Sequence, residues 1–159
     1  MAAVAVSKRA TGADLVQGPV TAGAVTITRL GAHLALAGTR LAGTSAPLLD
    51  FNKTDYEAAI GSGRLVALYF YASWCPICRA EFPQAQQAFN ELATDKVIGF
   101  RVNYNDSDTD ADEKALARQF GVAYQHTKVF VKNGARILKS PEGWDKDRYL
   151  REINNAIPQ

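Results

Sequence analysis

Residues 65–78 read LVALYFYASWCPIC, and this stretch decides the fold of the chain. Its first part, Leu65–Tyr71, is a continuous apolar run, which is typical of a strand buried on both faces of a sheet. Its last part is a Cys-x-x-Cys motif formed by Cys75 and Cys78. Pro76 suits the first turn of a helix, because its missing N–H would have no partner there. The stretch therefore predicts a buried strand that passes directly into a helix, with two thiols at the junction.

The position of the two thiols predicts their chemistry. Cys75 lies where the helix begins, and the unpaired N–H groups and positive end of a helix stabilise a thiolate there. Cys78 lies three residues further on and on the same helix face, within reach to resolve a mixed disulfide. We expect Cys75 to be the more exposed thiol, because Cys78 belongs to the buried stripe of the helix. Trp74 offers a flat apolar surface on which a substrate chain can dock.

The remaining elements follow from periodicity and turn signals. Thr54, with Glu57 three residues later, predicts a capping box at a helix N-terminus, and Asn133-Gly134 predicts a hairpin. An acidic run, Asp106–Glu113, is better explained as the approach to a helix N-terminus than as a calcium loop. The strands are expected at 48–51, 65–71, 97–102, 127–132 and 136–139. One helix is expected at 55–60, a second begins at 76, a third ends at 120 and a fourth begins at about 145. This order predicts an α/β fold, with a central mixed sheet and helices on both faces.

Composition suggests a boundary near Ala46. The first aromatic residue is Phe51, so the preceding segment lacks the large side chains that build a core. We therefore interpret residues 1–46 as a low-aromatic N-terminal extension, which is a linker, a hairpin or a targeting remnant, and residues 47–159 as the folded domain. A hairpin within the extension would pair 25–30 with 33–37. We expect the extension to be dispensable for the fold.

Charge and cysteine content exclude several functions. The formal net charge is +2, which gives no general attraction to nucleic acid. No apolar run approaches the roughly 18 residues that would span a bilayer. The only two cysteines both lie in the motif, so neither a four-sulfur zinc site nor a disulfide framework can form. The pair is therefore better interpreted as a reactive dithiol that needs no organic cofactor.

The chain resembles the thioredoxin superfamily, and in particular its extracytoplasmic thiol–disulfide reductase (TlpA-like) branch. The resemblance is carried by FYASWCPICRAEFP at 70–83, by FGV at 120–122 and by FVKNG at 130–134, and it extends over about 48–157. It implies a thioredoxin fold and a thiol–disulfide oxidoreductase that acts on protein dithiols and disulfides. It also implies that Cys75 is the attacking thiol and Cys78 the resolving thiol.

Two residues depart from the family pattern. The family has a buried Asp where this chain has Tyr69, and we interpret the nearby Glu81 as a solvated helix residue rather than a substitute. The family has a cis-proline facing the dithiol where this chain has His126. The resemblance thus implies that His126 points at the two sulfurs. There it either tunes the thiolate or joins Cys75 and Cys78 as a ligand of Cu(I) or zinc. The remaining alternative is a histidine that only hydrogen-bonds within its loop.

The sequence therefore predicts exchange of protein disulfides through a Cys-x-x-Cys dithiol. The alternative is a metal-binding thioredoxin-fold module or metallochaperone that uses Cys75, Cys78 and His126. The residues expected to bind substrate or tune the dithiol are Trp74, Pro76, Tyr124, Gln125, His126 and Thr127. We expect a monomer, with an extracytoplasmic or periplasmic location on the resemblance alone and a cytoplasmic one as the alternative. The direction of exchange, reductive or oxidative, is not encoded in the motif.

Overall fold

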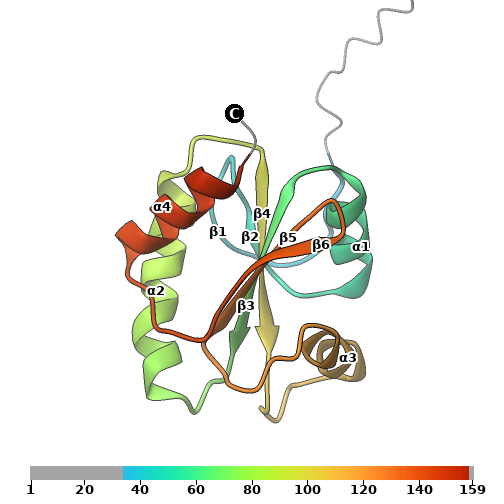
Figure 1. The fold of residues 1–159 in the computed structure, drawn as a ribbon, viewed down its shortest axis with the longest axis vertical. Coiled ribbons are helices and arrows are strands. Elements are labelled where there is room, and N and C mark those ends of the chain that lie inside the picture. The colour runs from blue at the N-terminus through green and yellow to red at the C-terminus, as the bar shows by residue number, and fades with distance from the viewer. Residues whose placement is uncertain (1–33, 158–159) are drawn as a thin grey trace, which may run out of the picture. The chain divides into compact units, whose positions relative to one another are not determined.

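A computed structural model describes residues 34–157 of the chain (Figure 1). The strands are β1 (Arg40–Ala42), β2 (Leu48–Asp50), β3 (Leu65–Tyr71), β4 (Val97–Asn103), β5 (Thr127–Lys132) and β6 (Ala135–Ser140). The helices are α1 (Lys53–Gly61), α2 (Pro76–Glu91), α3 (Ala111–Gln119) and α4 (Lys146–Ala156). None of the helices in this part of the chain is long and apolar enough to span a membrane.

All the described strands join one mixed sheet, as the sequence predicts. Its strand order is β1-β2-β4-β3-β5-β6, with β2, β4 and β3 parallel and the other pairs antiparallel. β3 lies in the middle and is buried along almost its whole length, which explains its continuous apolar sequence. Because β5 runs antiparallel to β3, Phe70 pairs with Thr127. The end of β3, where the Cys-x-x-Cys motif begins, therefore lies beside the segment that precedes β5.

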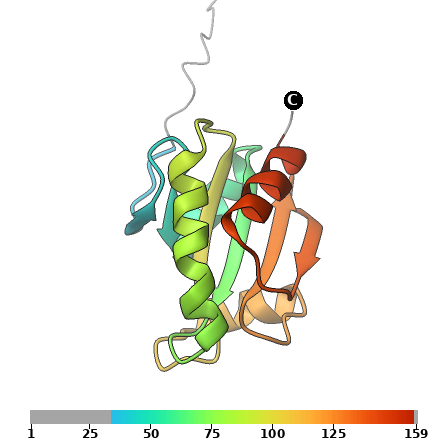
Figure 2. The same cartoon turned by 90° about the vertical axis from the view of Figure 1, so that its left-hand side faces the viewer.

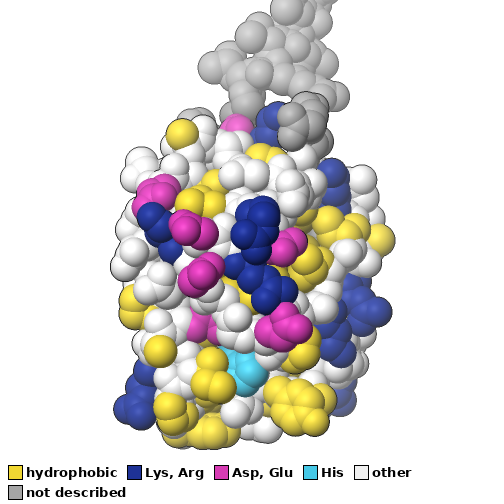
Figure 3. Space-filling model, turned by 60° about the vertical axis from the view of Figure 1, so that its left-hand side comes forward, with side chains coloured by type: hydrophobic (Ala, Val, Ile, Leu, Met, Phe, Trp, Pro, Cys, Tyr) yellow, Lys and Arg dark blue, Asp and Glu magenta, His cyan; other side chains and the backbone are white. Residues whose placement is uncertain are grey.

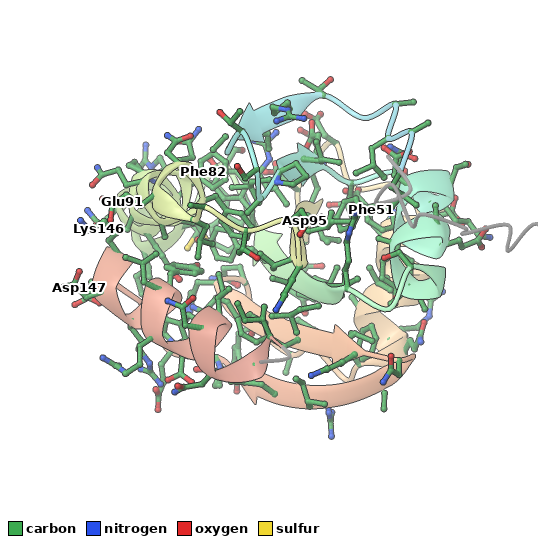
Figure 4. All side chains as sticks on the ribbon, turned by 90° about the horizontal axis from the view of Figure 1, so that it is seen from above. Phe51, Phe82, Glu91, Asp95, Lys146 and Asp147 are labelled. Carbon is green, nitrogen blue, oxygen red and sulfur yellow. The ribbon has the colours of Figure 1, made fainter. Side chains whose placement is uncertain are left out.

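Helices cover both faces of the sheet. In Figure 1, α2 and α4 lie on one side and α1 and α3 on the other, and Figure 2 shows α2 and α4 together in front of the strands. Each layer encloses its own core, one around Phe70 and Phe100 and the other around Phe89, Phe130 and Trp144. Figure 4 shows Lys146 of α4 beside Glu91 of α2, where their side chains form an ion pair of 2.7 Å.

Residues 34–46, which the sequence analysis assigned to the N-terminal extension, pack against the sheet and its helices. β1 pairs with β2, and Leu34 and Leu36 contact one of the two cores. The N–H groups of Ala37 and Gly38 donate to the buried carboxylate of Asp55 over 3.1 and 2.6 Å. Most of the hairpin expected at 25–37 lies outside the described residues, and its described part, 34–37, contains no strand.

Two helix caps differ in how well the sequence predicted them. The cap expected at Thr54 is wrong: α1 begins two residues earlier, because Asn52 is the N-cap and its side chain accepts the N–H of Asp55 over 2.9 Å. Asn52 is the cap because its backbone is extended and its side chain reaches the N–H of Asp55, whereas Thr54 already lies within the helix. The acidic run does lead into a helix, where Asp110 and Glu113 form a complete capping box on α3.

Candidate active site

Cys75 is the N-cap residue of α2. Its sulfur accepts the backbone N–H of Cys78 over 3.2 Å, and its own extended backbone turns β3 into the helix. Both cysteines are free thiols. This geometry places the Cys75 sulfur against the unpaired amide end of α2, which stabilises negative charge on it.

Cys78 lies one turn into α2 and faces the interior. Burial, together with a hydrogen bond to Cys75, raises the pKa of the Cys78 thiol to about 11. The expected difference in exposure between the two thiols is wrong, because Cys75 is only 1% exposed and Cys78 is fully buried. Electrostatic environment and position at the helix end distinguish the two thiols, whereas exposure does not.

The loop that precedes the dithiol is held by the loop after β4. The N–H of Ser73 donates to the Asp106 carboxylate over 2.5 Å, and the indole N–H of Trp74 donates to the Asn105 carbonyl over 2.9 Å. The N–H of Ser73 lowers the pKa of Asp106. Sequence reasoning treated Asp106 only as part of an acidic run. Its contact with Ser73 depends on two parallel strands ending at the same edge of the sheet, which spacing alone does not reveal.

Three exposed apolar side chains are contributed by the segments around the thiols. Trp74 is 53% exposed, Ile77 50% and Tyr124 63%. Figure 3 shows hydrophobic side chains beside the surface of the one described histidine, His126. A single exposed apolar side chain is ordinary, whereas several that gather beside a reactive group indicate a docking surface.

The segment before β5 contains the predicted substrate-binding residues. His126 adopts a left-handed backbone, with φ of 54°, and no cis peptide bond occurs among residues 34–157. The Nδ1 atom of its half-buried side chain has no hydrogen-bond partner in the described structure. Thr127 is buried, and its hydroxyl donates to the Tyr124 carbonyl over 2.7 Å. Thr127 thus shapes this loop, whereas Tyr124 is exposed and Gln125 partly exposed.

A buried ion pair lies next to the dithiol and was not predicted. The Lys128 ammonium lies 2.6 Å from Glu81 Oε1, and the Tyr149 hydroxyl donates to the same oxygen over 2.6 Å. The interpretation of Glu81 as a solvated residue is wrong, since it is only 4% exposed. One sequence signal could have found the pair: Lys128 directly precedes the apolar run 129–131 of a buried strand, and an inward-facing lysine needs a buried partner.

The metal hypothesis finds no support. Among the described residues, no group of three His, Cys, Asp or Glu side chains is arranged to hold a metal ion, and this includes Cys75, Cys78 and His126. The histidine is therefore not a third ligand to the two sulfurs in this arrangement.

Comparison with known proteins agrees with this site. The thioredoxin family model matches residues 47–155. A thioredoxin from Mycolicibacterium smegmatis is 32% identical over 98 residues, which cover 62% of this chain and 83% of that protein. A protein disulfide-isomerase from Gallus gallus is 34% identical over 88 residues, covering 55% of this chain and 16% of that protein. The crystal structure of a Malassezia sympodialis thioredoxin superposes with a TM-score of 0.55 at 25% identity, covering 69% of this chain and 93% of that one.

The family match extends over more than half of the chain, and it includes the junction of β3 and α2 where both thiols lie. The chain therefore belongs to the thioredoxin family and is a thiol–disulfide oxidoreductase.

Proposed function

We propose that the protein exchanges disulfides with protein substrates, with Cys75 as the attacking thiol and Cys78 as the resolving thiol. The observation that carries this assignment is the helix cap: Cys75 Sγ accepts the N–H of Cys78 at the start of α2. An anion on Cys75 is stabilised there, whereas the raised pKa of Cys78 keeps that thiol protonated at neutral pH.

The exchange proceeds in two balanced steps. The Cys75 thiolate attacks one sulfur of the substrate disulfide, so that a mixed disulfide forms and the other substrate sulfur leaves as a thiolate. Cys78 then loses its proton and attacks Cys75 Sγ. The Cys75–Cys78 disulfide forms, the bond to the substrate breaks, and the released proton passes through solvent to the departing substrate thiolate. The substrate gains two electrons, and the dithiol is oxidised. The reverse sequence oxidises a substrate dithiol.

The surface around the thiols favours a polypeptide substrate. Trp74, Ile77 and Tyr124 are all about half exposed or more, and together they offer apolar area on the sides of the motif. Pro76 is exposed next to them, and Gln125 and His126 are partly exposed. An extended chain that carries a disulfide can bury these side chains as it binds, which orients its sulfur toward Cys75.

The test is insulin disulfide reduction in the presence of dithiothreitol, followed with the wild-type chain and with single serine variants. Cys75→Ser should abolish the reaction. With oxidised substrate and no dithiothreitol, Cys78→Ser should trap a covalent mixed disulfide, which is visible on a non-reducing gel and is released by reductant. Trapping by Cys75→Ser instead would reverse the two roles, and full activity in both variants would exclude the dithiol mechanism.

Other assignments stay predictions. The extracytoplasmic location and the placement in the extracytoplasmic reductase branch rest on the sequence resemblance alone, as does the expectation of a monomer. The direction of exchange depends on the reduction potential of the Cys75–Cys78 pair, which a glutathione redox titration measures.

A further inference from the structure

The Lys128 side chain is buried in a charged form. It is 1% exposed, and its nitrogen donates to Glu81 Oε1, to the His126 carbonyl over 2.7 Å and to the Glu142 carbonyl. Three acceptors need three N–H donors, and only an ammonium group has three. The hydrogen bonds therefore show that Lys128 carries a positive charge inside the protein. The rings of Trp144 and Tyr69, whose centroids lie 5.0 and 5.7 Å from the nitrogen, provide further favourable contact for a cation.

Glu81 supplies the counter-charge, but only one of its two carboxylate oxygens is hydrogen-bonded in the described structure. Its Oε1 atom accepts from both Lys128 and Tyr149, an arrangement that suits an ionised carboxylate. Its Oε2 atom is buried and has no hydrogen-bond partner in the described structure. Glu81 also lines an open groove of about 280 Å³, together with Ile77, Gly143 and Trp144. We call Glu81, Lys128 and Tyr149 the buried charge cluster.

The buried charge cluster is connected to Cys78 from two sides. Glu81 lies three residues after Cys78 in α2, so the two side chains are neighbours on one helix face, and both are buried. Tyr69 on β3 is the cross-strand partner of Lys128 on β5. The Tyr69 hydroxyl donates to the Cys78 carbonyl at 3.5 Å, and its ring lies beneath the Lys128 ammonium. The Tyr69 side chain thus contacts both the Lys128 ammonium and the backbone of Cys78.

A buried ion pair contributes little net stability, because removing both charges from water costs about as much as their attraction returns. Its position beside a reacting sulfur suggests another role. We propose that Lys128 is a positioning residue for disulfide exchange, and that its buried ammonium stabilises the Cys78 thiolate which resolves the mixed disulfide. The inference rests on the proposed role of Cys78 as the resolving thiol.

The electrostatics around Cys78 agree with this role. Cys78 is surrounded by Cys75 at the start of α2, by Tyr69 from β3, by Glu81 from α2, by Lys128 from β5 and by Tyr149 from α4. Of these groups only Lys128 brings a positive charge. Burial lowers the pKa of Lys128, whereas Glu81 and, to a smaller extent, an anionic Cys78 raise it. The attraction is mutual, so the ammonium favours the thiolate by the same amount.

The test measures the pKa of Cys78 in the full chain, from thiolate ultraviolet absorbance, in a Cys75→Ser background that removes the other thiol. Lys128→Met should raise that pKa by about one unit, and Glu81→Gln, which leaves the ammonium without its counter-charge, should lower it by about one unit. The double variant should fall near the starting value, because it removes one charge of each sign. Lys132→Met, on the same strand and bonded to the Ala156 carbonyl, is the matched control and should change nothing.

A second measurement uses the intact dithiol. In Lys128→Met, the mixed disulfide should resolve about tenfold more slowly at neutral pH, because one pKa unit reduces the thiolate fraction tenfold. Shifts of the same sign in both single variants, or no shift in either, would overturn the proposal and leave a purely structural ion pair. If Lys128→Met fails to fold, Lys128→Gln, which also removes the charge but keeps a hydrogen-bond donor, takes its place and should raise the pKa of Cys78 in the same direction. Because the pKa is measured without turnover, a failure here is distinguishable from a failure of the proposed exchange reaction.

Discussion

The backbone N–H of Ser73 donates to the carboxylate of Asp106 over 2.5 Å, and this bond joins the loop before the dithiol to the loop after β4. The neighbouring bond from Trp74 to the Asn105 carbonyl runs between the same two loops. Asn105 itself has a left-handed backbone, with φ of 51°, which turns the chain at the point of contact. The conformation of the segment that presents Cys75 therefore depends on a residue more than 30 positions away along the chain.

Replacing Asp106 with alanine should loosen this segment. We expect Asp106→Ala to lower the free energy of unfolding by about 1 kcal/mol and to slow insulin reduction several-fold, because its carboxylate loses the bonds from the N–H groups of Ser73 and of the adjacent Ser107. Asp108→Ala is the matched control, since Asp108 is exposed and its carboxylate accepts the hydroxyl of the adjacent Ser107. Chemical denaturation and the insulin assay measure the two effects. Equal behaviour of the two variants would show that the Ser73 contact does not hold the segment.

The same contact makes a prediction about pH. The N–H of Ser73 lowers the pKa of Asp106 below its ordinary value of 3.8. A lowered folded-state pKa means that the stabilisation is complete above the ordinary pKa and is lost as pH falls through the lowered value. The stability difference between wild type and Asp106→Ala should therefore be constant near neutral pH and shrink under acid conditions. A difference that grows with acidity would contradict the assignment.

The two thiols should differ in alkylation. Since burial raises the pKa of Cys78 to about 11, this thiol is protonated at neutral pH and reacts poorly with iodoacetamide. Cys75 should therefore be modified first, and modification of Cys78 should increase only in strongly alkaline solution. Mass spectrometry of the two modified peptides separates the sites, and denatured protein, in which both thiols react alike, is the control. Earlier modification of Cys78 would reverse the proposed roles.

Local sequence predicted those parts of the site that lie within one strand and helix. The apolar run of β3, Pro76 and the two cysteines all belong to one continuous stretch, so spacing alone placed Cys75 at the helix end. The Asp106 contact and the buried charge cluster were not predicted, because they join segments that meet only in the folded sheet. Glu81 shows the difference most directly: its neighbours in sequence suggest solvent, whereas Lys128 and Tyr149 bury it from two other elements.

The boundary of the folded domain can be tested by truncation. Two shortened chains, one that starts at Leu34 and one that starts at Ser45, differ by β1 and by the bonds from Ala37 and Gly38 to Asp55. We expect the shorter chain to lose at least about 2 kcal/mol of stability, since the Asp55 carboxylate would remain buried with fewer partners. Thermal and urea unfolding compare the two. Equal stability would show that residues 34–44 are dispensable, as the sequence alone suggested.

The last prediction concerns His126, which the sequence resemblance aligns with the family's cis-proline. Its φ of 54° lies in the left-handed region, where an L-residue costs about 1 kcal/mol or more and glycine almost nothing. The Lys128 ammonium donates to the His126 carbonyl over 2.7 Å, and this bond favours the observed backbone. His126→Gly should therefore be more stable than His126→Ala by about 1 kcal/mol, since both variants lack the side chain and differ only in backbone strain.

His126→Pro should be the least stable of the three, because proline fixes φ near −65° and the carbonyl would turn away from Lys128. Urea unfolding ranks the variants. A proline variant as stable as the glycine variant would show that this loop readily adopts the family's conformation, and that the left-handed histidine is not required by the buried lysine beneath it.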